Sequence, residues 1–422
     1  MATSYFRLSA GQLGDLATGG GSPETIGLLC QSQYSKHVLM LEAVAAAAPA
    51  TGPASDLLAQ VQREDAAAAE AVMRYPSVGA WAYRTTLALH GGPQLPGATL
   101  EGLNAVAAAA ASRAGLAAEI DVPAHGGVVM LPSLGAAEVP ATSQATVRVA
   151  RDGTQVEAGG ECVTIPPDYQ AAPGWRPIRP LLAGIVVDDI DPFRMPADPR
   201  LGPAPDLARW RSACDDAWTL LHQYHPTVAA EVAAVITAVV PLAKPSSGLD
   251  SSSSPEAFGA IAMSEPPDPV EAALALAHET QHMKLSAVLD LVRLLRPDDG
   301  SLYYAPWRED PRPVGGLLQG AYAFLGVTAF WRRQLHRAAA PDFLAEVEFA
   351  RWRDAVALAC GTLLDSGQLT DDGELFVAAI AETLRPWRDE SVTDQAQRLA
   401  DEENERHTTR WTSQNGPVTT SR

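Results

Sequence analysis

Two histidines stand four residues apart in the segment His278-Glu279-Thr280-Gln281-His282. Residues four apart on a helix share a face, so the two imidazoles would lie side by side with nitrogens able to bind one metal ion. Glu279 stands where a zinc peptidase carries the general base that activates the metal-bound water. The competing interpretation is a pair of core histidines satisfied by hydrogen bonds. We take the spacing as evidence for a metal-binding helix.

The flanking residues predict where this helix begins and ends. Asp268 can cap it, Pro269 suits its first position, and Glu271 stands where a capping-box carboxylate would. The helical pattern runs to about Leu295 and is followed by Pro297. Leucines and valines on either side of the motif indicate substantial burial, and neutral histidines in such a place need strong partners.

Two kinds of chemistry use such a pair of histidines. A zinc peptidase needs a third ligand downstream, but the residues after His282 do not continue an HExxHxxGxxH pattern, and no NExxSD-type helix follows. The alternative is an Fe(II) site of two histidines and one carboxylate, with open positions for a 2-oxo acid and oxygen. Glu348, in a half-apolar stretch, is the favoured third ligand, and His336 and His407 are its rivals.

A loop rich in arginine and aromatic residues follows the predicted metal helix. In this loop, the guanidinium of Arg312 could bind a carboxylate through two hydrogen bonds, such as the distal carboxylate of 2-oxoglutarate. Gln319 and Tyr322 lie three residues apart on the next predicted helix and could line the same pocket. Helix capping by the arginine and ordinary packing of the other two remain open.

The composition excludes several classes of partner. Lys and Arg number 31 against 50 Asp and Glu, a net charge of −19, whereas binding nucleic acid requires a basic surface. The four cysteines have neither disulfide-framework nor zinc-ribbon spacing. We find no secretory signal pattern at the start and no run of the ~18 apolar residues that a membrane span needs. A soluble, cytoplasmic protein with no nucleic-acid or membrane partner is expected.

The periodicity of apolar residues predicts an α+β fold that is predominantly α-helical, with a small, mostly antiparallel β segment in the middle of the chain. The expected regions are an N-terminal helical region (1–118), a small β-rich region (119–192), a helical catalytic region carrying the HExxH motif (193–412) and a disordered tail (413–422). Short strands are expected at 127–131, 145–149, 161–165 and 184–187. A helix is expected over Thr227–Val240, and the Ser-rich segment Ser247–Ser254 is expected to be a flexible linker.

Longer stretches of the sequence resemble a known family. They are Ala277–Asp290, Tyr304–Pro313, Leu318–Tyr322, Phe330–Arg333 and Glu348–Arg353. They are similar to the HExxH-motif peptide-modification family, whose members are iron(II)- and 2-oxoglutarate-dependent peptide β-hydroxylases. That family accompanies radical SAM enzymes in the biosynthesis of ribosomally synthesised, post-translationally modified peptides. The resemblance covers nearly the whole chain, without a radical SAM half.

This resemblance implies a function and a role for each motif residue. His278 and His282 would hold iron, 2-oxoglutarate would chelate it, and a side chain of a bound precursor peptide would be hydroxylated at its β-carbon. Glu279 would then support a ligand instead of acting as a base. Phe324 stands where relatives are expected to carry a histidine, so the resemblance leaves open whether the site is altered. Zn(II) would replace iron if the peptidase interpretation held, and a peptide-binding module without catalysis is the third interpretation.

Overall fold

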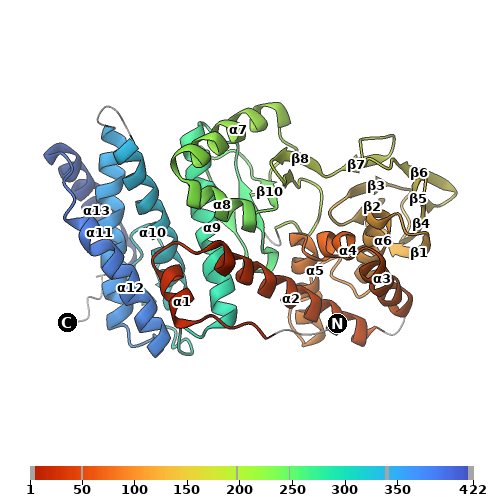
Figure 1. Cartoon of the computed structure of the whole chain (residues 1–422), viewed down its shortest axis with the longest axis horizontal. Coiled ribbons are helices and arrows are strands. Elements are labelled where there is room, and N and C mark those ends of the chain that lie inside the picture. Colours follow the sequence, from red (N-terminus) through yellow and green to blue (C-terminus); the bar gives the residue numbers. More distant parts are fainter. Residues whose placement is uncertain (1–4, 49–50, 196–197, 247, 338–341, 417–422) are drawn as a thin grey trace. The chain divides into compact units, whose positions relative to one another are not determined.

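The computed structural model describes residues 5–48, 51–195, 198–246, 248–337 and 342–416. The fold is α+β and mostly helical, as the sequence predicts (Figure 1). The chain divides into two compact units. Among the described residues, unit 1 comprises Gln31–Arg211 and Ile236–Glu265, whereas unit 2 comprises the residues from Tyr5 to Cys30, Ser212–Val235 and the chain from Pro266 onwards. Unit 2 therefore gathers segments from the beginning, middle and end of the chain, whereas the four regions expected from the sequence are consecutive.

Unit 1 is built on helices with small, apolar side chains. Its helices are the later part of α2 (Pro23–Ala47), α3 (Gly52–Glu64), α4 (Ala66–Met73), α5 (Pro76–Leu89), α6 (Gly102–Ala114) and the 3₁₀ turn η2 (Pro255–Ala257). Helix α6 packs against α3, α4 and strand β1 (Ala118–Pro123). Its alanines from Ala107 to Ala111 are fully buried, and their small side chains allow neighbouring elements to approach closely.

The strands of unit 1 form three sheets. Their orders are β1-β4-β5-β6, β2-β3-β7 and β11-β12-β10-β9-β8. The strands besides β1 are β2 (Val128–Leu131), β3 (Gly135–Glu138), β4 (Gln144–Ala150), β5 (Gly153–Ala158), β6 (Glu161–Ile165), β7 (Trp175–Pro177), β8 (Arg179–Leu182), β9 (Ile185–Val187), β10 (Ala238–Pro241), β11 (Ser251–Ser253) and β12 (Ala260–Met263). Each of the four predicted strands is confirmed, and the pairing in the first two sheets is antiparallel throughout.

The third sheet contains pairings that the sequence analysis missed. Strand β10 runs parallel to both β9 and β12, and it occupies the end of the segment that was expected to continue a helix to Val240. The helix there, α8, stops at Val235. The run Ala238–Pro241 is buried at every position, as in a central parallel strand, and a short apolar run of this kind cannot be told from a buried helix by periodicity.

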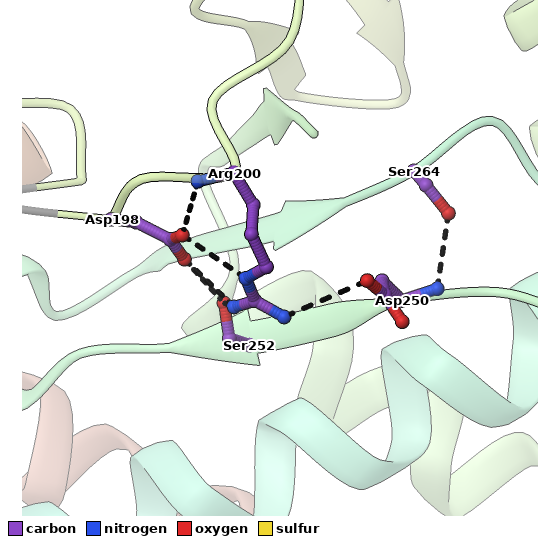
Figure 2. Close-up of polar contacts among 5 residues, drawn as sticks. All are labelled: Asp198, Arg200, Asp250, Ser252 and Ser264. Carbon is purple, nitrogen blue, oxygen red and sulfur yellow. Dashed lines mark hydrogen bonds and ion pairs between the residues drawn. The ribbon is translucent and has the colours of Figure 1, made fainter. Parts of the chain in front are cut away.

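The Ser-rich segment is not the linker that the sequence suggested, since Ser251–Ser253 pair antiparallel with β12. Figure 2 shows the polar contacts beside this edge strand. Arg200 Nη2 lies 2.7 Å from both Asp198 Oδ2 and Ser252 Oγ, and the backbone N–H of Asp250 donates to Ser264 Oγ at 3.0 Å. Backbone pairing and these side-chain bonds order a segment whose composition is typical of loops. Ser247 lies outside the described residues.

Unit 2 carries the HExxH helix. Its elements are α1 (Ala10–Ala17), the later part of α7 (Leu207–Tyr224), α8 (Pro226–Val235), α9 (Pro269–Leu291), α10 (Val314–Arg337), α11 (Phe343–Asp365), α12 (Asp371–Arg388), α13 (Asp394–Asn415), β13 (Leu302–Tyr303) and β14 (Arg312–Pro313). Helix α9 packs against α8 and α10, and α10 packs against α11, which in turn contacts α12 and α13 (Figure 1). The expected disordered tail begins too early, because residues 413–415 belong to α13; residues 417–422 lie outside the described part.

Helix α10 is the one described helix that is long and apolar enough to cross a membrane. Two thirds of its apolar window (67%) is buried inside the protein, between α9 and α11 among other elements. This burial accounts for its apolar composition as that of a core helix.

The helix that carries the two histidines begins as predicted. The Asp268 carboxylate accepts hydrogen bonds from the backbone N–H groups of Val270 (2.8 Å) and Glu271 (3.0 Å), and Pro269 occupies the first position. The helix ends at Leu291, one turn before the predicted end, where Val292 adopts an extended conformation.

A buried ion pair holds another face of α9. Lys284 Nζ lies 2.9 Å from Glu231 Oε2 of α8 and donates to the carbonyl oxygen of Gly19 at 2.9 Å. Gln281 Nε2 donates to the same carbonyl at 2.8 Å. The Lys284 side chain has no exposed surface and that of Glu231 is 6% exposed. These contacts tie α9 to α8 and to the segment after α1, so they fix the rotation of the helix about its axis.

We expect Lys284→Met to destabilise the protein by about 3–5 kcal/mol, because Glu231 would remain buried without its cation. The double variant Lys284→Met/Glu231→Leu should recover much of that loss, since no charge then remains in the core. Urea denaturation of the parent, both single variants and the double variant measures the coupling. Strictly additive effects would show that the two side chains do not stabilise each other.

A second buried polar cluster lies in unit 1, in the loop after β9. Tyr75 Oη donates to Asp188 Oδ2 at 2.8 Å, and Ser77 Oγ donates to Asp191 Oδ2 at 2.7 Å. The backbone N–H of Asp191 also donates to Asp188 Oδ1 at 2.9 Å. Burial, and then the nearby Asp188 carboxylate, raise the pKa of Asp191 to about 7.

This raised pKa predicts a pH dependence with a definite sign. A carboxyl that binds its proton more tightly when folded stabilises the protein fully below its ordinary pKa, and that stabilisation is lost as the pH rises through about 7. The free energy of unfolding of the parent, relative to Asp191→Asn, should therefore fall between pH 4 and pH 8 by a few kcal/mol, on the order of 1.4 per pKa unit. Asparagine can still accept from the backbone N–H of Phe193 through Oδ1 and can donate from Nδ2 to the Ser77 hydroxyl, so paired melts across this range isolate the charge. A difference that stays constant with pH would contradict the assignment.

Candidate metal centre

The two motif histidines face one another on α9. Their Nε2 atoms are 3.1 Å apart, and their ring centroids lie 4.8 Å apart with the rings nearly perpendicular. Both residues are of intermediate exposure, although the His278 ring itself is surrounded by protein atoms. The predicted shared face is confirmed, and it brings two nitrogen donors to one point.

Helix α10 fixes the orientation of one imidazole. Gln319 Oε1 lies 3.0 Å from His282 Nδ1, and Gln319 Nε2 donates to Ser286 Oγ at 3.4 Å. An amide oxygen can only accept, so we assign the proton to Nδ1 of His282 and a lone pair to its Nε2, which faces His278. A ligand histidine whose other nitrogen donates to an oxygen is the usual arrangement at metal centres.

The protonation state of His278 also suits metal binding. Burial lowers the pKa of His278 to about 4; Glu279 opposes this shift and His282 adds to it. The ring is therefore neutral at physiological pH and has a lone pair to share. A neutral imidazole is the form that binds a divalent ion.

An aromatic wall lies beside the histidines. Phe324 of α10 packs edge-on against His278, with centroids 5.2 Å apart, and stacks on Trp307 at 4.9 Å. Its other neighbour is Trp352 of α11, at 4.3 Å. An added Cβ at Gly320 would lie 2.3 Å from the Trp307 ring, so only glycine leaves space for this indole. The wall gives one side of the pair an apolar surface that disfavours water.

The favoured third ligand is not brought to the histidines. Glu348 Oε2 accepts a hydrogen bond from Trp352 Nε1 at 2.6 Å. Its rivals also have other partners: His336 lies 3.2 Å from Glu390 Oε2, and His407 Nδ1 lies 2.8 Å from the Tyr304 hydroxyl. Across the described residues, no group of three or more His, Cys, Asp or Glu side chains is arranged to hold a metal ion.

The three residues predicted to bind the cosubstrate have different contacts in the structure. Gln319 contacts His282 itself, so in this structure it orients one of the candidate ligands. Tyr322 is fully buried and donates its hydroxyl proton to the Leu16 carbonyl at 2.7 Å; the expectation that it lines the pocket is wrong, because that face of α10 packs into the core. Arg312 forms an ion pair with Asp310 at 3.1 Å.

Glu279 is only 2% exposed, although it lies next to His278 in the sequence. A general base must reach a water molecule at the metal, and Glu279 has little contact with solvent in this structure. Zinc peptidases carry their general base at the same position of the motif, so its place on α9 is compatible with either role.

Comparison with known proteins adds no assignment. No protein-family model matches the sequence, and no curated protein is significantly similar to it.

We predict that Gln319→Leu weakens divalent-metal binding by about 10–100-fold, because the His282 ring would lose the acceptor that fixes its tautomer and orientation. Gln334, a buried glutamine further along the same helix, provides the matched control, and Gln334→Leu should leave metal affinity unchanged. Titration with Co(II) or Zn(II), followed by absorbance or calorimetry, gives the affinities. Equal affinities of parent and Gln319→Leu would show that the contact does not orient a ligand.

Proposed function

We propose that the chain is an Fe(II)- and 2-oxoglutarate-dependent enzyme that hydroxylates the β-carbon of a side chain in a ribosomally synthesised precursor peptide. The observation that carries the proposal is the pair His278–His282, with its nitrogens 3.1 Å apart and one ring oriented by Gln319. The likeness of the motif and its flanking stretches to the peptide β-hydroxylase family provides the reaction class.

The two donors fit a single divalent ion. Nitrogens about 2.0–2.1 Å from one ion lie ~2.9 Å apart when they subtend a right angle and ~3.4 Å apart at the tetrahedral angle. The observed 3.1 Å falls between these limits without any movement of the backbone. In the described part of the chain no third His, Cys, Asp or Glu side chain joins these two imidazoles, which leaves coordination positions for a chelating cosubstrate.

The histidine pair and the residues around it would each have a separate role in the proposed reaction. His278 and His282 would hold the ion, and Gln319 would keep the lone pair of His282 directed at it. When bound, iron and 2-oxoglutarate supply the oxidising power that inserts one atom of dioxygen into a C–H bond while the cosubstrate loses carbon dioxide. Phe324 and Trp307 would keep water from one side of the pair and offer an apolar surface to the substrate side chain.

Arg312 is the cation that we propose for the distal carboxylate of 2-oxoglutarate. An added Cβ at Gly316 would lie 3.0 Å from Arg312 Nε, so the guanidinium lies over the first turn of α10. Gln319 is one turn further along the same helix. A planar guanidinium can bind a carboxylate through two parallel hydrogen bonds, and Arg312 would exchange its ion pair with Asp310 for this contact.

The proposal also names partners and a compartment. The substrate is a precursor peptide made in the cytoplasm, and a radical SAM enzyme of the same pathway is the expected neighbour. The negative net charge of −19 favours a peptide with basic residues outside the modified segment.

The test is reconstitution with iron. Protein prepared without oxygen is supplied with Fe(II), 2-oxoglutarate, the precursor peptide encoded beside its gene, and then air. Mass spectrometry should show the gain of one oxygen atom on a β-carbon and one succinate per hydroxylation. Replacing either metal histidine, in His278→Ala or His282→Ala, should abolish both products and reduce iron binding at least tenfold, whereas His336→Ala, the matched surface control, should retain them.

Other outcomes identify the competing functions. Cleavage of the peptide with Zn(II) in the absence of iron would assign a metallopeptidase. Full iron occupancy in His278→Ala or His282→Ala would overturn the metal site. Binding of the peptide without any metal or reaction would assign a binding module that keeps the fold alone.

A further inference from the structure

The loop after β9 in unit 1 places two carboxylates in the interior, and one of them, Asp191, lines a cavity. Asp188 and Asp191 are 1% and 2% exposed. Asp191 Oδ2 accepts from Ser77 Oγ, and its Oδ1 accepts from the backbone N–H of Phe193 at 2.8 Å. A carboxylate offers about four lone-pair positions, so Asp191 can still accept from another donor.

The cavity next to this cluster has a volume of about 260 Å³. Apart from Ser77, Asp191 and His125, its lining is apolar, and Trp81 and Phe193 provide aromatic faces. The remaining walls come from α5, α6, β2 and the loops beside them. A mostly apolar cavity with a few convergent polar groups is the usual form of a small-molecule site.

Close packing at two glycines shapes these aromatic walls. An added Cβ at Gly102 would lie 2.4 Å from Trp81 Nε1, so glycine is required for the tryptophan to occupy its place. Gly97, with φ of +80°, would bring a Cβ to 3.6 Å from the Phe193 ring. Both positions line the cavity, and larger residues would displace the aromatic rings or narrow the space.

The charges around the cluster favour a cationic ligand group. Arg194 is the cation that acts on both carboxylates, and its Nη1 donates to the backbone carbonyl of Asp191 at 2.6 Å instead of to a carboxylate oxygen. The neighbouring Asp189 is different, because it pairs directly with Arg179 at 3.2 Å. Once the pH exceeds the raised pKa of Asp191, Asp188 and Asp191 together carry more negative charge than the Arg194 guanidinium balances.

We propose that this cavity binds a compact apolar molecule bearing one primary ammonium group, with its body between Trp81 and Phe193 and its ammonium at Asp191. The ammonium would donate to a free lone pair of the carboxylate and add the second positive charge to the cluster. Aromatic faces are favourable surroundings for an ammonium as well as for an apolar body. This site lies in unit 1, and the inference does not depend on the function proposed for the histidine pair.

Three molecules of similar size test the charge requirement. They are 2-phenylethylamine, the neutral 2-phenylethanol and the anionic phenylacetate, each titrated at pH 8 against the full chain by calorimetry or ligand-observed NMR. The amine should bind saturably and at least tenfold more tightly than the alcohol, and phenylacetate should not bind. Comparable binding of amine and phenylacetate, or no saturable binding of the amine at millimolar concentration, would overturn the proposal.

Variants separate the carboxylate from the cavity. Asp191→Asn should reduce the affinity for the amine to that for the alcohol, whereas Asp189→Asn, the matched change two residues away and outside the cavity lining, should leave it unchanged. Ala105→Leu, which fills the cavity from α6, should remove binding of both molecules. Circular dichroism and thermal melting verify that each variant is folded, and an amine affinity unaffected by Asp191→Asn would rule out the assigned contact.

Discussion

The proposed metal site in unit 2 depends on one constraint: two imidazoles a single turn apart on α9 must present their lone pairs to the same point. Helix geometry provides the proximity, but a 3.1 Å separation of the Nε2 atoms also requires both rings to be correctly turned. Burial lowers the pKa of His278, so its ring is neutral, and the contact with Gln319 orients the His282 ring. Lys284, about 200° away around the helix from His282, anchors another face through Glu231, so the histidines cannot rotate out of position.

Interactions within α9 were predictable from the sequence, whereas those between α9 and α10 were not. The histidine spacing, the Asp268 cap and Pro269 act within a few residues, and the structure confirms the helix that they predict. The role of Gln319 could not be derived, because it depends on how α10 packs against α9. Residues three apart on a helix point about 60° apart, and this was enough to place Gln319 at His282 while Tyr322 entered the core.

The fold shows the same limit. Short β-type runs in the sequence identified β4 and other antiparallel strands of its region, and in β4 every second side chain is buried. The parallel pairing of β10 with β9 and β12 joins segments far apart in the chain, and no local pattern specifies it. Ser251–Ser253 became an edge strand because their backbone pairs with β12, whatever their composition suggests. Sequence patterns over a few residues therefore predicted the fold class, whereas the division into two units depends on contacts between segments far apart in the chain.

A chain of contacts accounts for the position of Glu348 relative to the histidines. His278 touches Phe324, Phe324 touches Trp352, and the Trp352 indole donates to the Glu348 carboxylate. Two aromatic rings therefore separate the Glu348 carboxylate from the His278 imidazole. The carboxylate accepts its hydrogen bond from the indole N–H of Trp352. A histidine in place of Phe324 would add a third nitrogen where this chain has an apolar face. The Phe324 ring gives one side of the histidine pair an apolar surface, and the pair itself provides two nitrogen donors. We infer that such a site suits a cosubstrate that provides its own oxygen ligands better than it suits a peptidase, which must bind and activate water.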